Sequence, residues 1–353
     1  TKGMGFGTCL GTKTGPHASP LEGSHANSFE SADVRALAAA ECGLLVPENE
    51  LKWYAVRPDA NSFDFERADR LMAYAAQSHL AVRGHTLLWN FPKWMQEWEK
   101  AYDFGPHPAA EAERVLRQHI GRVCGRYGTR IFSYDVINET IDPATGRLRD
   151  TGFSRALGDN LFDIAFHATR DAAPHAELVY NDYMTWTDGN EKHYAGVLRV
   201  LEYMRKKNIP IDALGIQSHI GTGTEGSSGF LRPNEKVWRG FLDDVTAMGI
   251  GLIVTELDVE DKLAPGNVTT RDKAVADYTR GYLDLILSYP QTRYVMAWGL
   301  VDSYSWLRNY SPRPDGQPKR PCPYDDDLKP KPLREAIAAA FRSAPDRPAV
   351  RFG

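Results

Sequence analysis

Two glutamates stand out because each follows a short run of β-branched and aromatic residues typical of a strand. Glu139 ends the run Y-D-V-I-N-E, and Glu256 lies within V-T-E-L-D. Hydrolysis of a glycosidic bond needs such a pair of carboxyl groups: one protonates the leaving oxygen, and the other attacks the anomeric carbon or activates water. The distance between the carboxyl groups decides between retention and inversion, and the sequence spacing does not supply that distance.

Each glutamate has neighbours suited to one of these roles. Asn138 precedes Glu139 and has the chemistry to hydrogen-bond a sugar 2-hydroxyl. A chain from Asp258 through His219 to Glu256 would keep that carboxylate ionised and oriented, as a nucleophile requires. Glu139 must instead carry a proton in the free enzyme, and opposed environments of this kind separate acid from nucleophile. A histidine packed in the core is the competing interpretation of His219.

Further polar and aromatic residues follow the other predicted strands. Carboxylates, amides and an ammonium group offer hydrogen bonds to sugar hydroxyls, and aromatic rings offer apolar walls. Scattered polar residues would not favour one end of every strand, so we interpret the set as one binding cleft. Its members are Glu48, Asn49, Lys52, His85, Trp89, Asn90, Asn138, Asn181, Tyr183, Gln217, Trp298 and Trp306.

Strand-like runs alternate with longer stretches of helical periodicity along the whole chain. The predicted strands are Met4–Cys9, Leu44–Val46, Leu80–Val82, Ile131–Ile137, Glu177–Tyr180, Ala213–Ile216, Leu252–Thr255 and Tyr294–Trp298. The predicted helices are Ala32–Ala40, Arg67–Gln77, Ala110–Tyr127, Ser154–Ala172, Glu191–Lys207, Val237–Met248, Lys273–Ser288 and Leu333–Ala340. Eight strand–helix units predict an α/β fold, a closed (β/α)8 TIM barrel in a single domain over residues 1–353, with a short tail from about residue 343.

A doubly wound sheet with a nucleotide site is the alternative arrangement. Such a sheet usually carries a glycine-rich turn after its first strand. Here the first predicted strand is followed by G-T-K-T-G-P (11–16), which is not G-x-G-x-x-G, and the chain has no P-loop motif. The barrel is therefore favoured, and in a barrel the residues after the strands share the face that carries active sites.

The composition narrows the range of partners. The formal net charge is -4 with no basic run, which argues against nucleic acid, and no apolar run approaches the roughly 20 residues of a membrane span. An aromatic content of 11%, with eight Trp and sixteen Tyr, suits a protein that binds a neutral polysaccharide. The four cysteines form no C-x-x-C pair, so no metal site is expected, and both a disulfide and free thiols stay open. A chain that begins at Thr1 leads us to expect a processed, secreted or periplasmic protein.

Eight short motifs in this chain resemble those of glycoside hydrolase family 10, the xylanase family. They are P-E-N-E-L-K-W (47–53), G-H-T-L-L-W (84–89), Y-D-V-I-N-E (134–139), Y-N-D-Y (180–183), G-I-Q-S-H (215–219), V-T-E-L-D (254–258), W-G-L-V-D (298–302) and P-K-P (330–332). All eight occur in family order and end barrel strands, so the resemblance spans about residues 6–337.

The resemblance implies a retaining endo-β-1,4-xylanase that acts on xylan and xylo-oligosaccharides without a cofactor, and we expect a monomer. It implies that Glu139 is the acid/base and Glu256 the nucleophile, with His219 and Asp258 as its partners. It also implies that Glu48, Asn49 and Lys52 bind the non-reducing-side sugars. The residues near the cut sugar would be His85, Trp89, Asn138, Gln217, Trp298 and Trp306.

Two departures from the family pattern bear on the cleft. Asn90 replaces the usual histidine after Trp89, and we expect its side chain to lie in the cleft. The segment Leu307–Pro323 is rich in proline and arginine and predicts a long loop on the active face. A hydrolase for another or a decorated β-glycan, and a catalytically weak sugar-binding barrel, are the competing functions.

Overall fold

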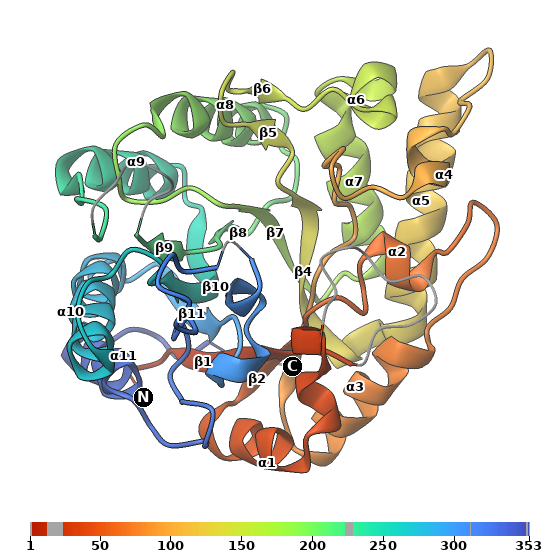
Figure 1. Ribbon diagram of the computed structural model, residues 1–353. Helices are drawn as coiled ribbons and strands as arrows, with labels where there is room; N and C mark the ends of the chain where they lie inside the picture. The colour runs from red at the N-terminus through yellow and green to blue at the C-terminus, as the bar shows by residue number, and fades with distance from the viewer. Residues whose placement is uncertain (1, 13–23, 223–228, 311, 351, 353) are drawn as a thin grey trace.

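The computed structural model describes residues 2–12, 24–222, 229–310, 312–350 and 352, and its main sheet is a closed barrel (Figure 1). The barrel strands are β1 (Gly5–Leu10), β2 (Leu44–Pro47), β3 (Ala81–Gly84), β4 (Ile131–Asn138), β7 (Glu177–Asp182), β8 (Ala213–Ile216), β10 (Gly251–Glu260) and β11 (Thr292–Ala297). They pair in parallel in this order, and β11 pairs with both β10 and β1, which closes the ring. The predicted (β/α)8 barrel is confirmed.

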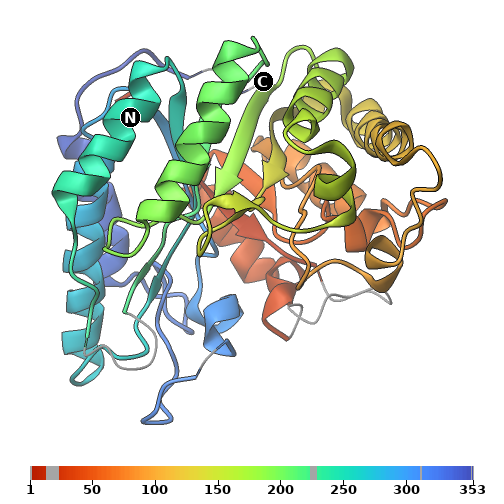
Figure 2. The ribbon, with the colours of Figure 1, turned by 90° about the horizontal axis from the view of Figure 1, so that it is seen from above.

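Helices surround the strands on every side. The long ones are α1 (Ala32–Glu41), α3 (Glu66–Gln77), α5 (Pro108–Tyr127), α7 (Asn160–Ala172), α8 (Glu191–Lys206), α9 (Glu235–Ala247), α10 (Val268–Ile286) and α11 (Pro332–Ser343). Figure 2 shows α8, α9 and α10 side by side along one flank of the barrel. After α11, residues 344–350 and 352 carry neither helix nor strand.

Shorter elements lie between these units, mostly in the loops that follow the strands. They are the helices α2 (Trp53–Val56), α4 (Glu97–Lys100) and α6 (Gly152–Leu157), the strands β5 (Ile141–Asp142), β6 (Arg147–Leu148) and β9 (His219–Gly221), and the 3-10 helices η1 (Ser24–Glu30), η2 (Gly128–Arg130), η3 (Asp302–Tyr304) and η4 (Trp306–Arg308). Periodicity did not predict them, because two to seven residues are too few to establish a repeat.

One predicted helix was wrong, since the stretch Ser154–Ala172 forms two helices. Helix α6 begins earlier, at Gly152, because the Thr151 side chain accepts a hydrogen bond from the Ser154 N–H and caps the first turn. It ends at Gly158, whose φ of 55° lies in the left-handed region that favours glycine. A new helix, α7, then starts at Asn160.

The core explains why the barrel strands read as continuous apolar runs. Every residue of β2 and β8 is buried, because helices cover the outside of the barrel while side chains fill its inside. Bulky rings such as Trp238, Phe162 and Tyr282 are fully buried within the barrel and helix layers. Cys9, Cys42, Cys124 and Cys322 are all free thiols.

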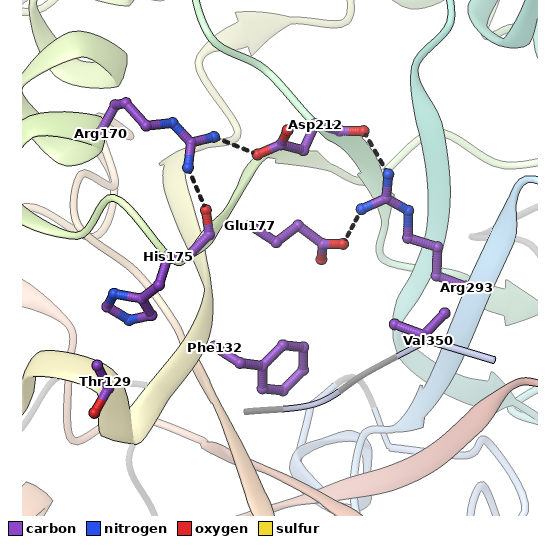
Figure 3. Close-up of a pocket in the computed structure, with 9 residues that line it drawn as sticks. Thr129, Phe132, Arg170, His175, Glu177, Asp212, Arg293 and Val350 are labelled. Atoms are coloured by element: carbon purple, nitrogen blue, oxygen red, sulfur yellow. Dashed lines mark hydrogen bonds and ion pairs between the residues drawn. The ribbon is translucent and has the colours of Figure 1, made fainter.

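At the N-terminal end of the barrel, ion-paired side chains and the tail residue Val350 line a pocket of about 560 Å³ (Figure 3). Arg170 pairs with Asp212 at 2.6 Å, and Arg293 pairs with Glu177 at the start of β7. The tail residue Phe352 packs edge-on against Phe132, with 5.1 Å between ring centroids. This end lies opposite the strand ends that carry Glu139 and Glu256.

Candidate active site

The carboxyl ends of the barrel strands surround a cleft of about 520 Å³ that contains most of the predicted site residues. The predicted residues that line it are Glu48, Asn49, Lys52, His85, Trp89, Asn138, Glu139, Tyr183, Gln217, His219, Glu256, Trp298 and Trp306. Both glutamates predicted to be catalytic therefore share one cleft, although 117 positions separate them in the chain (256 minus 139). Parallel strands in a barrel bring such distant residues together.

Glu256, on β10, is held as an ionised carboxylate. Its Oε1 accepts a hydrogen bond of 2.9 Å from Asn181 Nδ2, and its Oε2 lies 3.3 Å from His219 Nε2. Burial alone would raise the pKa of Glu256, but the hydrogen bond from His219 and the nearby His85 and Lys52 lower it to about 2. A carboxylate that is ionised and held by hydrogen bonds has the properties of a nucleophile.

His219 is held in turn by Asp258. Its Nδ1 lies 2.7 Å from Asp258 Oδ1, while Asp258 Oδ2 accepts a 2.7 Å hydrogen bond from Trp306 Nε1. Burial would lower the pKa of His219, but Asp258 and Glu256 raise it to about 10. The imidazole is therefore a cation at neutral pH, and Asp258 lies behind it rather than in the cleft.

Glu139 has the opposite environment. Its Oε1 accepts a 2.7 Å hydrogen bond from Gln217 Nε2, and its Oε2 accepts one of 3.0 Å from Trp89 Nε1. Burial raises the pKa of Glu139 and the carboxylate of Glu256 raises it further, against those two hydrogen bonds. The group retains its proton at a higher pH than an ordinary glutamate does, as a general acid requires.

Asn181 does not line the cleft, although the sequence predicts that it contacts the substrate. The side chain is fully buried, and its Nδ2 donates to both Asn138 Oδ1, at 2.8 Å, and Glu256 Oε1, at 2.9 Å. Its Oδ1 accepts from the Thr255 hydroxyl at 2.7 Å. Both polar atoms of the Asn181 side chain are hydrogen-bonded, so Asn181 fixes the positions of Glu256 and Asn138 from outside the cleft.

Asn90 does not line the cleft either, although a substrate contact is predicted at this position. Its side chain is only 1% exposed, and neither amide atom has a hydrogen-bond partner among the described residues. Trp89 forms a bridge with Asn138 on β4 and turns its ring into the cleft. Successive residues of an extended chain point in opposite directions, so Asn90 points away.

The motif after β2 lines another part of the cleft. Lys52 Nζ donates to Asn49 Oδ1 at 3.0 Å and lies 4.8 Å from the centre of the Trp89 ring. Tyr54 donates a second hydrogen bond of 2.7 Å to the same oxygen. Glu50, in the same motif, faces away and accepts hydrogen bonds from Thr12. Asn49 is thus pre-oriented, which lowers the entropy cost of binding a sugar.

His85, after β3, is oriented by a residue inside the barrel. Its Nδ1 lies 2.8 Å from Asp135 Oδ2, and Asp135 also pairs with the fully buried Arg83. The imidazole stands edge-on to Trp298, with 5.5 Å between ring centroids.

Several cleft residues were not predicted from the sequence. Phe91 and Trp94 follow Trp89 and form an aromatic cluster with it, and Lys93 Nζ lies 4.3 Å from the centre of the Trp94 ring. Thr185 and Tyr310 line the cleft from other loops. The run W-N-F-P-K-W (89–94), with three aromatic residues in six positions after a strand, was an available signal. Tyr310 belongs to the predicted Leu307–Pro323 loop, which does border the active face. In the described part of the chain, no group of three or more His, Cys, Asp or Glu side chains is arranged to hold a metal ion.

Comparisons with known proteins agree with this geometry. The family model for glycosyl hydrolase family 10 matches residues 13–340. Endo-1,4-beta-xylanase 3 of Hypocrea jecorina is 32% identical over 87% of this chain and 78% of its own length. Endo-1,4-beta-xylanase B of Paenibacillus barcinonensis is 31% identical over 88% of this chain and 95% of its own. The crystal structure of xylanase 10B from Thermotoga maritima superposes with a TM-score of 0.79 at 24% identity, over 97% of this chain and 95% of that one. A barrel with this cleft, matched by the family model over most of its length, belongs to glycosyl hydrolase family 10.

Proposed function

We propose that the protein is a retaining endo-1,4-β-xylanase that cleaves the backbone of xylan and xylo-oligosaccharides. The observation that carries this proposal is the contrast between two carboxyl groups in one cleft: the pKa of Glu139 is raised, and that of Glu256 is lowered to about 2. Family membership supplies the bond that is cut and the retention of configuration.

The first step is glycosylation. The Glu256 carboxylate attacks the anomeric carbon, the bond to the leaving oxygen breaks, and Glu139 transfers its proton to that oxygen. The product is a covalent ester between Glu256 and the sugar, with Glu139 left as a carboxylate. His219 keeps its proton in this step, because its Nδ1 stays paired with the Asp258 carboxylate 2.7 Å away.

The second step is hydrolysis of the ester. Glu139 takes a proton from water, the resulting oxygen attacks the anomeric carbon, and Glu256 leaves as a carboxylate. Both glutamates return to their starting protonation states, and the anomeric configuration has been inverted twice. No cofactor takes part.

The cleft is lined by side chains from several loops, as an enzyme that binds several sugars of one chain requires. Lys52 and Asn49 line one part, while Tyr183 and Phe91 line another. Aromatic rings such as Trp89 and Trp298 provide apolar walls against the C–H faces of the sugars.

The proposal includes a monomer that works outside the cytoplasm, where a polysaccharide substrate is found. Among the described residues, the exposed large hydrophobic side chains are Val237, Val268 and Tyr310, and they lie on separate elements. They form no contiguous apolar patch suited to an obligate subunit interface. Within the described residues, no helix combines the length and apolar character needed to cross a bilayer.

Two variants test the division of labour. Glu256→Ala should abolish turnover of every substrate. Glu139→Ala should lower the turnover of xylan about 10²–10⁴-fold. It should leave the rate of glycosylation unchanged for aryl xylobiosides whose leaving groups need no proton. Azide should then rescue Glu139→Ala and yield a β-glycosyl azide. Identical behaviour of the two variants on aryl substrates would show that the roles are wrongly assigned.

A panel of glycans separates the competing functions. Turnover is measured on linear xylan, decorated xylans and β-glucans, with the anomer of the first product followed by NMR. We expect the highest kcat/KM on xylan and a β-anomer at first. Preference for a β-glucan would favour the related hydrolase, and binding without turnover would favour a sugar-binding barrel.

A further inference from the structure

We infer that Arg149 is a positioning residue for proton donation: it holds the backbone of Glu139 and ties it to the wall of the cleft that receives the leaving group. The inference rests on the proposed role of Glu139 as acid/base. Arg149 does not line the cleft, so it acts through the residues that it contacts.

The first observation is the backbone conformation of Glu139. Its φ is 52°, in the left-handed region that residues with a side chain rarely adopt. This conformation turns the side chain off the end of β4 and into the cleft. A residue held there needs support from its surroundings, because an ordinary conformation would aim the carboxyl group elsewhere.

The support comes from both sides of Glu139. Its backbone N–H donates to the Asn181 carbonyl at 2.9 Å, and its own carbonyl accepts a 2.7 Å hydrogen bond from Arg149 Nε. Asn181 belongs to a barrel strand and is fixed by the sheet. Arg149 is the second support, and it comes from a separate loop.

That loop is built to return the chain to Glu139. After Glu139, strands β5 and β6 form an antiparallel hairpin, with Ile141 opposite Leu148. Arg149 follows directly, and its backbone N–H donates to the Thr140 carbonyl at 2.9 Å. The N-cap of α6 then anchors the next residues, since the Ser154 hydroxyl donates to the Arg149 carbonyl at 2.6 Å.

The other contacts of Arg149 reach the part of the cleft lined by Tyr183 and Phe91, which we assign to the leaving group because Asn49 and Lys52 are expected to bind the non-reducing-side sugars. One terminal nitrogen, Nη2, donates to the Tyr183 hydroxyl at 2.6 Å, and the guanidinium carbon lies 3.7 Å from the centre of the Phe91 ring. Tyr183 and Phe91 both line the cleft. A sugar that binds against these rings is therefore linked through one guanidinium to the backbone of the proton donor.

The charge of Arg149 supports a dedicated role. Its side chain is buried, the residue being 8% exposed, and no carboxylate in the described ranges forms an ion pair with it. A buried cation without a carboxylate partner is costly, so its hydrogen bonds and its aromatic neighbour must compensate. A purely structural position would be filled at less cost by an apolar side chain.

The test is the dependence of kcat/KM on the leaving group, because this parameter reports glycosylation. In Arg149→Met we expect kcat/KM to fall about 10–100-fold on xylotriose, whose leaving sugar needs a proton. On 2,4-dinitrophenyl β-xylobioside we expect kcat/KM to fall less than about threefold. Arg149→Lys retains one donor and should recover part of the loss on xylotriose alone. Tyr183→Phe removes the second hydrogen bond and should show a smaller loss with the same preference.

Two further variants serve as negative and positive controls. Arg155→Met removes an arginine of the neighbouring helix α6 that pairs with Asp150 on the surface, its side chain being 64% exposed, and it should behave as the wild type on both substrates. Glu139→Ala shows the full leaving-group dependence. Equal losses on both substrates in Arg149→Met and Arg149→Lys, with Glu139→Ala selective, would overturn the inference and leave the proposed function intact. Absence of selectivity in Glu139→Ala itself would overturn the proposed function.

Discussion

At the scale of single residues, hydrogen bonds decide which glutamate carries the proton. Glu256 is bonded by His219 and Asn181, while Glu139 is bonded by Gln217 and Trp89. The hydrogen bond from His219 opposes the effect of burial on Glu256, whereas burial prevails at Glu139. The proposed mechanism requires Glu256 to be ionised and Glu139 to be protonated, so kcat/KM is expected to fall below the pKa of Glu256 and above that of Glu139.

Removal of His219 should move only the acid limb of this profile. The imidazole lowers the pKa of Glu256 to about 2 from the ordinary 4.5, so in His219→Ala the pKa should rise. From about pH 6 to about pH 4, kcat/KM of the wild type should stay level while that of His219→Ala declines. The basic limb, set by Glu139, should not move and serves as the internal control. An unchanged acid limb with a large loss of thermal stability would favour a core histidine.

Asn90 leads to a different prediction. Its buried amide has no partner among the described residues, so Asn90→Leu, which keeps the branching at Cγ, should leave the melting temperature unchanged or raise it. On linear xylo-oligosaccharides kcat/KM should stay within about threefold, because the side chain does not reach the cleft. Asn90→His adds volume to a packed site and should cost about 1–3 kcal/mol of stability. A tenfold loss of kcat/KM in Asn90→Leu would show that Asn90 acts on the cleft.

At the scale of elements, the loop after η4 is held by buried charges rather than by apolar packing. Lys319, which is 1% exposed, donates to Glu260 Oε2 at 2.6 Å and to the Tyr310 carbonyl at 2.5 Å. Arg320 forms two hydrogen bonds with Asp272 on α10, at 2.8 and 2.7 Å. These contacts fix the position of Tyr310, whose ring lies 4.8 Å from that of Trp306 at the cleft.

Lys319→Met should therefore affect both stability and substrate binding. It leaves the Glu260 carboxylate partly buried without its partner, and the loss of one member of such a pair costs about 3–5 kcal/mol. The Tyr310 carbonyl also loses its hydrogen bond from Lys319, so KM for long xylo-oligosaccharides should rise more than kcat falls. Lys329→Met breaks an exposed pair with Asp327 in a neighbouring loop and should change stability by less than about 1 kcal/mol. Equal effects of the two variants would contradict this account.

At the scale of the whole molecule, one end of the barrel carries the cleft, and the contacts at the other end contribute to stability. The carboxyl ends of the strands carry the cleft, whereas ion pairs and the C-terminal tail border a separate pocket at the amino ends (Figure 3). Arg347 in this tail donates to the carbonyls of Leu287 and Thr292, both at 2.7 Å. Phe352 then covers Phe132 and Tyr294.

Phe352→Ala should consequently lower stability without altering catalysis. The variant removes a half-buried ring and its two aromatic contacts. We expect the free energy of unfolding, measured by denaturant titration, to fall by about 1–3 kcal/mol. Values of kcat and KM should match those of the wild type, because the cleft lies at the other end of the barrel. Phe352→Leu should show a smaller loss. A change in KM without a change in stability would contradict the separation of the two ends.

The sequence by itself determined the barrel, and it predicted that Glu139, Glu256 and most of the cleft residues would share one face. Eight apolar runs alternating with helical periods leave few other folds, and polar residues at the ends of those runs must share one face. Glu139, Glu256 and His219 could be predicted in this way because strand ends position them directly. Ser154–Ala172 was misjudged because a positive φ at Gly158 outweighs helical periodicity.

Only the tertiary structure decided which side chains face the cleft and what holds them. Asn181 lies in one of the eight motifs and Asn90 directly follows another, yet neither side chain lines the cleft. A motif does not reveal toward which side of the chain each of its residues points. Arg149 carries no motif at all: it reaches Glu139 through a hairpin whose return path depends on contacts outside its own segment. The pKa contrast between Glu139 and Glu256 also needed the fold, since burial and hydrogen bonds come from residues distant in the chain.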